Sequence, residues 1–192
     1  NIKFFQCDIL NVKNLKTKFD VICCNGVLHH LEDPIEGWRQ LGKSLKDDGL
    51  MKISLYSKLA RNHLKPYQEK YAKCNFLDFK KEIQTFRNDV LNSSKSEIDN
   101  LTISRDFFNL SELRDLVFHC QEHQFTIPKI KDALKQLDFL FKGFENNKDL
   151  HDKFHSFFEK NKSVFNLNNW HKLEKANPKI FIDMYQFWIQ KK

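Results

Sequence analysis

Apolar positions along the first 57 residues follow two different spacings. Residues 19–24 (FDVICC) form an apolar run broken only by an aspartate, which predicts a strand buried on both faces of a parallel sheet. Asp33 and Pro34 then introduce a predicted helix, because proline is favoured at the first helical position. The apolar residues at helical spacing in this stretch are Ile35, Trp38, Leu41 and Leu45. Residues 50–55 (LMKISL) predict the next strand.

Three shorter signals complete this region. Residues 2–5 (IKFF) predict a short strand, and residues 27–31 predict a short helix. Residues 47–49 (DDG) predict a turn before the strand at 50–55. The order strand, helix, strand with short connections indicates a parallel α/β unit.

The pattern changes after residue 57. Residues 58–123 are helical or polar, with one helix predicted from Leu110 to about residue 120. The remaining predicted elements are a helix capped by Thr126, a strand at 138–145, helices at 147–161 and 167–176, and a final strand at 182–189. We therefore expect an α/β core formed by residues 1–57 and 124–192, with a helical insert at 58–123.

The composition is that of a folded, aromatic-rich domain. Of the 192 residues, 41% are hydrophobic and 19 are Phe, which excludes a disordered chain. The net charge is +7, but the lysines are spread among Asp and Glu along the chain. That distribution favours a solvated surface over a nucleic-acid groove. No apolar stretch has the length of a membrane span, so we expect no membrane partner.

The cysteines and the first residues bear on the compartment and on the extent of the chain. The five Cys include no Cys-x-x-Cys, and Cys23 and Cys24 lie inside the apolar run. This usage predicts a reducing, cytoplasmic compartment, where cysteine serves as a small buried hydrophobe. The chain begins with Asn1 and its first residues already predict a strand, so we expect a fragment of a longer protein.

The most informative block runs over residues 19–34 (FDVICCNGVLHHLEDP) and continues at 41–53 (LGKSLKDDGLMKI). It resembles the fourth strand, following helix and fifth strand of class I S-adenosylmethionine-dependent methyltransferases. Asp-Asp-Gly here replaces the usual Pro-Gly-Gly turn. Residues 105–108, 118–126 and 184–188 further resemble a bacterial methyltransferase group that often occurs fused to tetratricopeptide repeats, although this chain has no such repeats.

The resemblance implies a Rossmann-like α/β methyltransferase sheet, present from its third strand onward. In that fold the last strand is antiparallel and lies between the fifth and sixth strands. The implied reaction is transfer of a methyl group from the cofactor S-adenosylmethionine to an acceptor, expected to be a small molecule or a protein. Residues 58–123 follow the fifth strand, and we expect them to form a lid over the ligand edge of the sheet.

Three residues are candidates for binding the cofactor. Asn25 and Gly26 follow the strand at 19–24, and ligands of open α/β sheets bind beyond the carboxyl ends of strands. Gly26 lets the backbone approach a ligand closely, and Asn25 offers both a donor and an acceptor. By resemblance, the methionyl part of the cofactor passes here and Asp8 accepts a hydrogen bond from the adenine amino group. The alternative for Asp8 is a loop or helix-cap residue.

The chain departs from the family pattern at its beginning. It contains no Gly-x-Gly, the turn that lets backbone N–H groups approach the methionyl and ribose portions of the cofactor. The acidic residue that takes the ribose hydroxyls is also missing. Both elements would lie before Asn1, so we expect the chain alone to bind the cofactor weakly and to be inactive.

Methyl transfer depends mainly on positioning and desolvation, so a universal catalytic residue is not required. Where the acceptor must lose a proton, the candidate general bases are His29, Tyr56 and Glu122. The candidate substrate-binding residues all come from the expected helical insert, and they are Arg105, His119 and His123.

Two other functions fit parts of the sequence. A methyltransferase fold without its cofactor loop could serve as a non-catalytic interaction module. Residues 119–123 (HCQEH) also have the inverted zinc-hydrolase pattern, in which two His at i and i+4 on a helix bind zinc and Glu122 acts as the base. No third ligand is evident in the sequence, so we expect no metal.

Overall fold

The computed structural model describes residues 2–71, 79–94, 101–102, 105–119, 121–145, 147–159 and 162–192. The chain forms two compact units, one made of residues 1–60 and 122–192 and the other of residues 61–121. Within the described ranges, no helix combines the length and the apolar composition that a membrane span needs.

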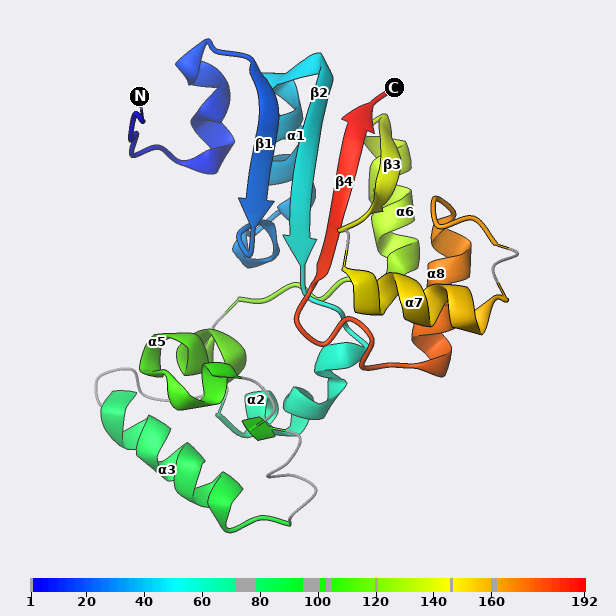
Figure 1. Ribbon diagram of the computed structural model, residues 1–192. Helices are drawn as coiled ribbons and strands as arrows, with labels where there is room; N and C mark the ends of the chain where they lie inside the picture. The colour runs from blue at the N-terminus through cyan, green and yellow to red at the C-terminus, as the bar shows by residue number, and fades with distance from the viewer. Residues whose placement is uncertain are drawn as a thin grey trace. The chain divides into compact units, whose positions relative to one another are not determined.

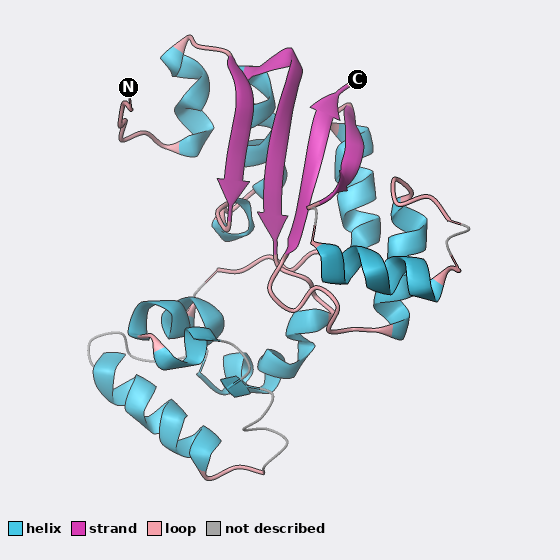
Figure 2. Ribbon diagram, viewed as in Figure 1, coloured by secondary structure: helices cyan, strands magenta, loops and turns pink. Residues whose placement is uncertain are grey.

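The first unit is built around a four-stranded sheet (Figure 1; coloured by element type in Figure 2). Its elements in chain order are η1 (Ile9–Leu15), β1 (Phe19–Asn25), η2 (Leu28–His30), α1 (Pro34–Ser44), β2 (Leu45–Leu55), α6 (Ile127–Gln136), β3 (Phe139–Phe144), α7 (Lys148–Phe157), α8 (Leu167–Ala176) and β4 (Tyr185–Lys191). The strand order is β1-β2-β4-β3. β1 and β2 are parallel, and β4 is antiparallel to both of its neighbours. The expected α/β sheet with an inserted antiparallel last strand is therefore confirmed.

β4 joins two strands that are far apart in the sequence. Phe187 at its centre pairs with Ile53 of β2 on one side and with Phe144 of β3 on the other. The strand contains aromatic and β-branched residues without Gly or Pro, a composition that suits a buried pleated surface. Alternate residues are fully buried, and these are Tyr185, Phe187 and Ile189.

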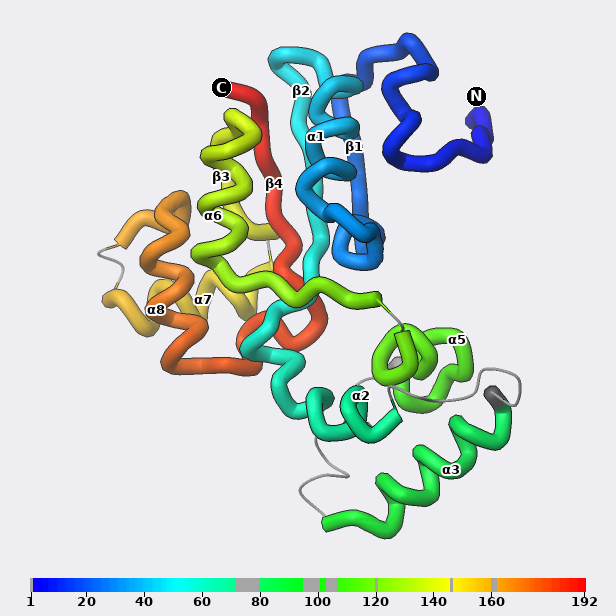
Figure 3. The backbone as a smooth tube through the Cα atoms, turned by 180° about the vertical axis from the view of Figure 1, so that it is seen from behind, coloured from blue at the N-terminus to red at the C-terminus, as the bar shows by residue number. Residues whose placement is uncertain are grey.

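Local capping groups define the two helices that cover the sheet. The Asp33 carboxylate accepts a hydrogen bond from the Ile35 N–H at 2.9 Å, with Pro34 at the start of α1. The Thr126 hydroxyl accepts one from the Lys129 N–H at 3.4 Å at the start of α6. Both predicted helix starts are confirmed. Seen from behind, α1 and α6 lie over the same face of the sheet (Figure 3).

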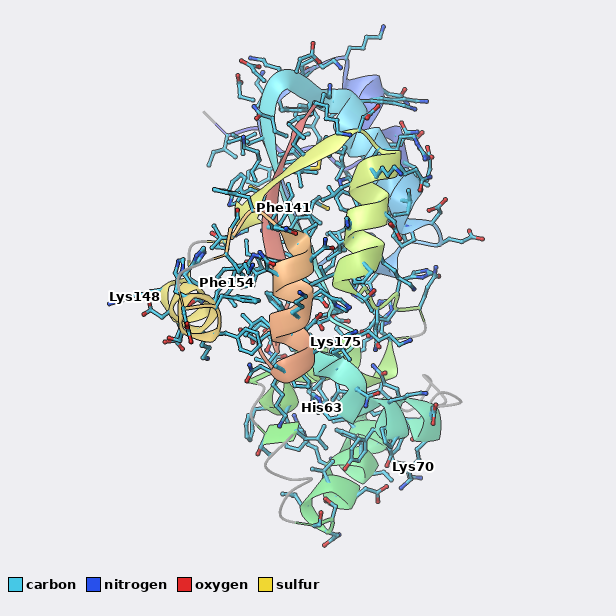
Figure 4. All side chains as sticks on the ribbon, turned by 90° about the vertical axis from the view of Figure 1, so that its right-hand side faces the viewer. His63, Lys70, Phe141, Lys148, Phe154 and Lys175 are labelled. Atoms are coloured by element: carbon cyan, nitrogen blue, oxygen red, sulfur yellow. The ribbon has the colours of Figure 1, made fainter. Side chains whose placement is uncertain are left out.

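Aromatic side chains dominate the core of the first unit. Trp38 of α1 lies against Phe187, with 5.9 Å between ring centroids, and both residues are fully buried. Phe154 of α7, labelled in Figure 4, lies against Trp170 of α8 with ring centroids 4.3 Å apart. The indole N–H of Trp170 donates to the Val164 carbonyl at 2.7 Å, so the one polar group of this buried side chain has a hydrogen-bond partner.

β1 is buried on one face only, so the prediction of a strand covered on both faces is wrong. Cys24 is buried, whereas Val21 is 52% exposed and Cys23 is also exposed. Successive side chains of a strand point to opposite faces, and the two covering helices lie over one face. The apolar run in the sequence therefore did not distinguish a strand that is buried on both faces from a strand that is buried on one face.

The strand predicted at residues 2–5 is also wrong. These residues have no regular structure, and Phe4 is 92% exposed. A strand needs a hydrogen-bonded neighbour, and none of the described strands pairs with this segment. Asp8 instead caps the 3-10 helix η1, where its carboxylate accepts from the Leu10 N–H at 2.8 Å.

The turn predicted at residues 47–49 lies within β2. Phe19 pairs with Leu45 but Val21 pairs with Leu50, so β2 bulges where it enters the ladder. Gly49 is required there, because a Cβ on it would stand 2.9 Å from the Asp20 carbonyl oxygen. The Asp-Asp-Gly signal marked a real irregularity, but the backbone stays in the sheet.

The second unit consists of helices. Its named elements are η3 (Ala60–Leu64, which begins in the first unit), α2 (Lys65–Tyr71), α3 (Phe79–Leu91), η5 (Arg105–Phe108), α5 (Leu110–Leu113) and η6 (Arg114–Phe118). The helix predicted from Leu110 to about residue 120 is confirmed as far as Phe118, and its second half, η6, has π-helical geometry. Phe86 is fully buried in this unit against the rings of Tyr67, Tyr71, Phe107 and Phe118.

Candidate functional site

The carboxyl ends of β1 and β2 lie at one edge of the sheet, because the two strands are parallel. Asn25 ends β1, and its side-chain oxygen accepts a hydrogen bond from the Ser54 hydroxyl of β2 at 2.9 Å. Gly26 follows with a φ of +70°, a conformation that residues with a side chain rarely adopt. This bond and this turn place the cofactor candidates Asn25 and Gly26 at the edge where open α/β sheets bind ligands.

Two candidate bases lie at the same edge. His29 belongs to η2, directly after β1, and Tyr56 directly follows β2. His29 is fully buried and Tyr56 is 9% exposed. Their ring centroids are 4.1 Å apart, and the His30 ring lies 4.3 Å from His29 on another side. The structure therefore brings together His29 and Tyr56, which lie 27 positions apart in the sequence.

A third segment, residues 122–125, joins this edge through its backbone. The His123 N–H donates to the His29 carbonyl at 2.8 Å, and the Phe125 N–H donates to the Tyr56 carbonyl at 2.9 Å. The Lys58 N–H donates back to the Phe125 carbonyl at 2.8 Å. Glu122 and His123 are therefore held next to the turns that carry His29 and Tyr56.

A hollow of about 540 Å³ opens beside this segment. Most of the lining residues carry charged or amide side chains, although about half of the lining surface is apolar; the lining consists of Pro34, Ile35, Lys58, Glu122, His123, Gln124, Phe125, Lys129, Asp132, Ala133 and Gln136. The Glu122 carboxylate accepts a hydrogen bond from the Gln124 side chain at 3.0 Å. Acids, bases and amides around one hollow suit a polar ligand better than an apolar one.

One buried group near this edge was not predicted from the sequence. Glu174 of α8 is fully buried, and one of its carboxylate oxygens accepts hydrogen bonds from the hydroxyls of Ser57 and Tyr185. The Ser57 bond measures 2.8 Å. In the sequence Glu174 stands between a leucine and a lysine, and nothing in that helical pattern distinguishes it from a solvated glutamate.

Burial governs the electrostatics of this edge. It raises the pKa of the Cys24 thiol to about 11, so the thiol is neutral at pH 7. Burial also raises the pKa of Glu174, and the hydroxyls of Tyr185 and Ser57 oppose part of that rise by donating to the carboxylate. The pKa of Tyr185 is raised by burial and by the adjacent Glu174 charge, so Tyr185 remains a donor.

Glu174→Gln is expected to stabilise the protein increasingly as the pH rises. Folding raises the pKa of Glu174, so its contribution to stability is complete below the unfolded-state pKa and is lost as the pH rises through the folded-state pKa. Glutamine imitates the neutral acid at every pH. Thermal unfolding between pH 4 and pH 8 should show the variant matching the native protein at the acid end and exceeding its Tm at neutral pH. The exposed Glu32→Gln is the control, and a difference that falls with pH would contradict the expectation.

The remaining predicted site residues are Asp8, Arg105 and His119. Asp8 caps η1 and is exposed, as in its alternative interpretation. Arg105 and His119 belong to the second unit, whereas His123 belongs to the first. The Arg105 side chain lies outside the described residues.

The helical zinc site suggested by residues 119–123 is wrong. His119 has an extended backbone after η6, and residues 121–124 are not helical. The i, i+4 geometry that would place two His on one helix face is therefore missing. Among the described residues, no group of three or more His, Cys, Asp or Glu side chains is arranged to hold a metal ion.

Comparison with known proteins identifies the fold. The sequence matches the family described as "Methyltransferase domain" over residues 1–51. The whole chain is similar in structure to PKMT2 from Rickettsia typhi, with a TM-score of 0.67 and 12% identity, over 97% of this chain and 38% of that one. The chain carries a class I methyltransferase fold. Within it, β1 and β2 correspond to the strands predicted at 19–24 and 50–55, and β4 is the antiparallel last strand.

Further relatives of this methyltransferase fold are similar over parts of the chain. A second structure of PKMT2 from Rickettsia typhi, in complex with AdoHcy, has a TM-score of 0.64 and 13% identity over 96% of this chain and 38% of that one. A tRNA U34 carboxymethyltransferase of Campylobacter lari is 32% identical over 108 residues, 56% of this chain and 37% of the relative. The enzyme of the same name from Campylobacter fetus subsp. fetus is 30% identical over 110 residues, which are 57% of this chain and 39% of the relative.

An uncharacterized protein of Synechococcus sp. is 39% identical over 71 residues, 37% of this chain and 17% of the relative. The chain thus spans less than two fifths of the length of each of these proteins.

Proposed function

We propose that this protein transfers a methyl group from S-adenosylmethionine to an acceptor at the edge where β1 and β2 end. The observation that carries the proposal is the convergence of Gly26, His29, Tyr56 and the segment 122–125 on that edge of a methyltransferase fold. The structural relative PKMT2 has been solved with AdoHcy, the product that remains once S-adenosylmethionine has lost its methyl group.

The residues at this edge suit such a cofactor. Asn25 is exposed, so its amide group can donate to the methionyl portion, and Ser54 fixes its orientation. Gly26 has a φ of +70°, which favours glycine, and its lack of a side chain leaves the backbone accessible to the cofactor. The exposed carboxylate of Asp8 is the proposed acceptor for the adenine amino group. When bound, the cofactor supplies an electrophilic methyl group.

The protein's part in the reaction is to align the acceptor and to accept its proton where one is lost. His29 and Tyr56 are packed together in a nearly dry environment, which excludes water from the site. Glu122 and His123 line the polar hollow beside them. We propose Glu122, His29 or Tyr56 as the base and His123, with His119 and Arg105 of the second unit, as acceptor-binding residues. The second unit is proposed to act as a lid that governs acceptor choice.

The acceptor is proposed to be a small molecule or a protein, because the lysines are interleaved with acids along the chain. A specific observation favours RNA as a second candidate, since two relatives are named tRNA U34 carboxymethyltransferase. The free cysteines Cys7, Cys23 and Cys24 support a cytoplasmic setting.

The test is a methyl-transfer assay with the full-length protein. Methyl-labelled S-adenosylmethionine is incubated with separated RNA, protein and small-molecule fractions of a cell extract, and the labelled fraction identifies the acceptor class. Calorimetry with AdoHcy on the same preparation measures cofactor binding. Binding together with label transfer supports the proposal. The absence of both AdoHcy binding and label transfer would favour the alternative, a non-catalytic interaction module.

Asn25→Ala is expected to weaken AdoHcy binding by about 1–3 kcal/mol, because a buried amino or carboxylate group of AdoHcy would lose its polar partner. Calorimetry on the full-length protein measures the change. Asn11→Ala removes an exposed asparagine of η1 and should leave the affinity within about 0.5 kcal/mol of the native value. Equal affinities for the native protein and Asn25→Ala would exclude Asn25 from the cofactor site.

A further inference from the structure

Glu174 is a carboxyl group that the fold buries without a cation. It lies near the end of α8 and is fully buried. Its first side-chain oxygen accepts from Ser57 and Tyr185, and its second has no hydrogen-bond partner among the described residues. Burying a carboxyl group is unfavourable even when it is partly satisfied, and an amide of the same shape could accept the same two bonds. A group retained on such terms calls for a role beyond packing.

The two donors of Glu174 come from β4 and from the turn that follows β2. Tyr185 is the first residue of β4, and Ser57 lies two residues beyond the end of β2. Glu174 thus connects α8 to the exit of β2 across 117 positions of sequence.

The residue held by Glu174 stands between two residues of the site. Ser57 follows Tyr56 and precedes Lys58 in the turn after β2. The Ser57 hydroxyl also accepts from the Ala60 N–H at 3.2 Å, which folds the turn back on itself. From the opposite side, Phe125 bonds to the backbone of Tyr56 and of Lys58. The turn is therefore fixed by Glu174 on its side chain and by Phe125 on its backbone.

We propose that Glu174 is a positioning residue of the methyl-transfer site, which fixes the turn at residues 56–58 and thereby holds the Tyr56 ring against His29. The catalytic part of this inference rests on the proposed function. The positioning of the turn depends only on the hydrogen bonds from Ser57 and Tyr185 to Glu174. Glu174 does not contact the hollow or the cofactor candidates in this arrangement and acts through Ser57.

The test uses the His29 imidazole as a reporter of the Tyr56 ring. With ¹³C-labelled histidine, the ring-proton resonance of His29 is shifted by the aromatic ring 4.1 Å away, and His29→Gln assigns the signal. Glu174→Ala should move this resonance toward its random-coil position, and Glu174→Gln, which retains an accepting oxygen, should restore it. Asp149→Ala removes an exposed carboxylate of α7 and is the control. A His29 signal unchanged in a folded Glu174→Ala variant would overturn the proposal, as would an equal shift in Asp149→Ala.

A second variant covers the case in which Glu174→Ala does not fold. Ser57→Ala removes one hydroxyl and little volume, so it is expected to keep the native circular dichroism while shifting the His29 resonance. A folded Ser57→Ala with a native His29 signal would also overturn the proposal.

Activity separates this inference from the proposed function. In the full-length protein, Glu174→Ala should lower kcat about tenfold or more and leave AdoHcy affinity within twofold, and Glu174→Gln should recover most of kcat. Lost AdoHcy affinity with an unchanged kcat would count against a positioning role. A His29 shift in a protein that transfers no methyl group would support the positioning of Tyr56 and reject the proposed function.

Discussion

Replacing Phe187 by Ala is expected to lower the free energy of unfolding by about 3–5 kcal/mol. Phe187 is fully buried at the centre of β4, where it pairs with Ile53 of β2 and Phe144 of β3. Its ring also packs against Trp38 of α1. Truncation removes contacts to two strands and a covering helix at once, and these elements cannot all close on the cavity. Urea unfolding followed by circular dichroism measures the loss.

The neighbouring Trp188 provides a matched control. It points to the other face of the sheet and is partly exposed, so Trp188→Ala should lower the stability by less than Phe187→Ala despite removing a larger side chain.

Deleting residues 184–192 removes the strand between β2 and β3 and should leave the protein unfolded or insoluble. A truncated protein that stays soluble with an unchanged Tm would refute the placement of β4.

Replacing Glu122 and His123 together by Ala is expected to reduce methyl transfer about 100-fold or more while cofactor affinity stays unchanged. Both residues line the polar hollow, and the His123 backbone is bonded to His29. The cofactor candidates Asn25 and Gly26 are not part of that lining. AdoHcy calorimetry and label transfer in the full-length protein measure the two effects separately.

The control for this double variant is Asp149→Ala with His155→Ala. It removes an acid and an imidazole from α7, away from the lining of the hollow, and should leave both measurements near the native values. If cofactor affinity collapsed in Glu122→Ala/His123→Ala while turnover at saturation stayed intact, the assignment of these residues to the acceptor would be wrong.

Signals that depend on neighbouring residues were sufficient for much of the fold. Asp33 with Pro34 predicted the start of α1, and Thr126 predicted the start of α6, because a cap bonds to N–H groups two or three residues away. The family resemblance of residues 19–34 and 41–53 predicted the sheet order and the insertion of β4. The same block placed Asn25 and Gly26 at the ligand edge, because both residues lie where β1 ends.

Signals that depend on distant partners were not sufficient. Residues 2–5 have the composition of a strand, but a strand exists only where another strand pairs with it. Residues 47–49 have the composition of a turn, but they lie inside β2, between Leu45 and Leu50, which both pair with β1. For the His-x-x-Glu-His string, the helix that would align its two histidines ends one residue before it, at Phe118.

The amino-acid sequence by itself determined the fold, the helix starts, the aromatic last strand and the position of Asn25 and Gly26 at the end of β1, because each is encoded in a continuous run of residues. Only the tertiary structure decided which side chains meet there. His29, Tyr56 and residues 122–125 come together through backbone bonds between separate segments. Glu174 is distinguished from the exposed glutamates only by what α8 packs against. Burial and partnership are properties of the folded chain, and they give these residues their chemistry.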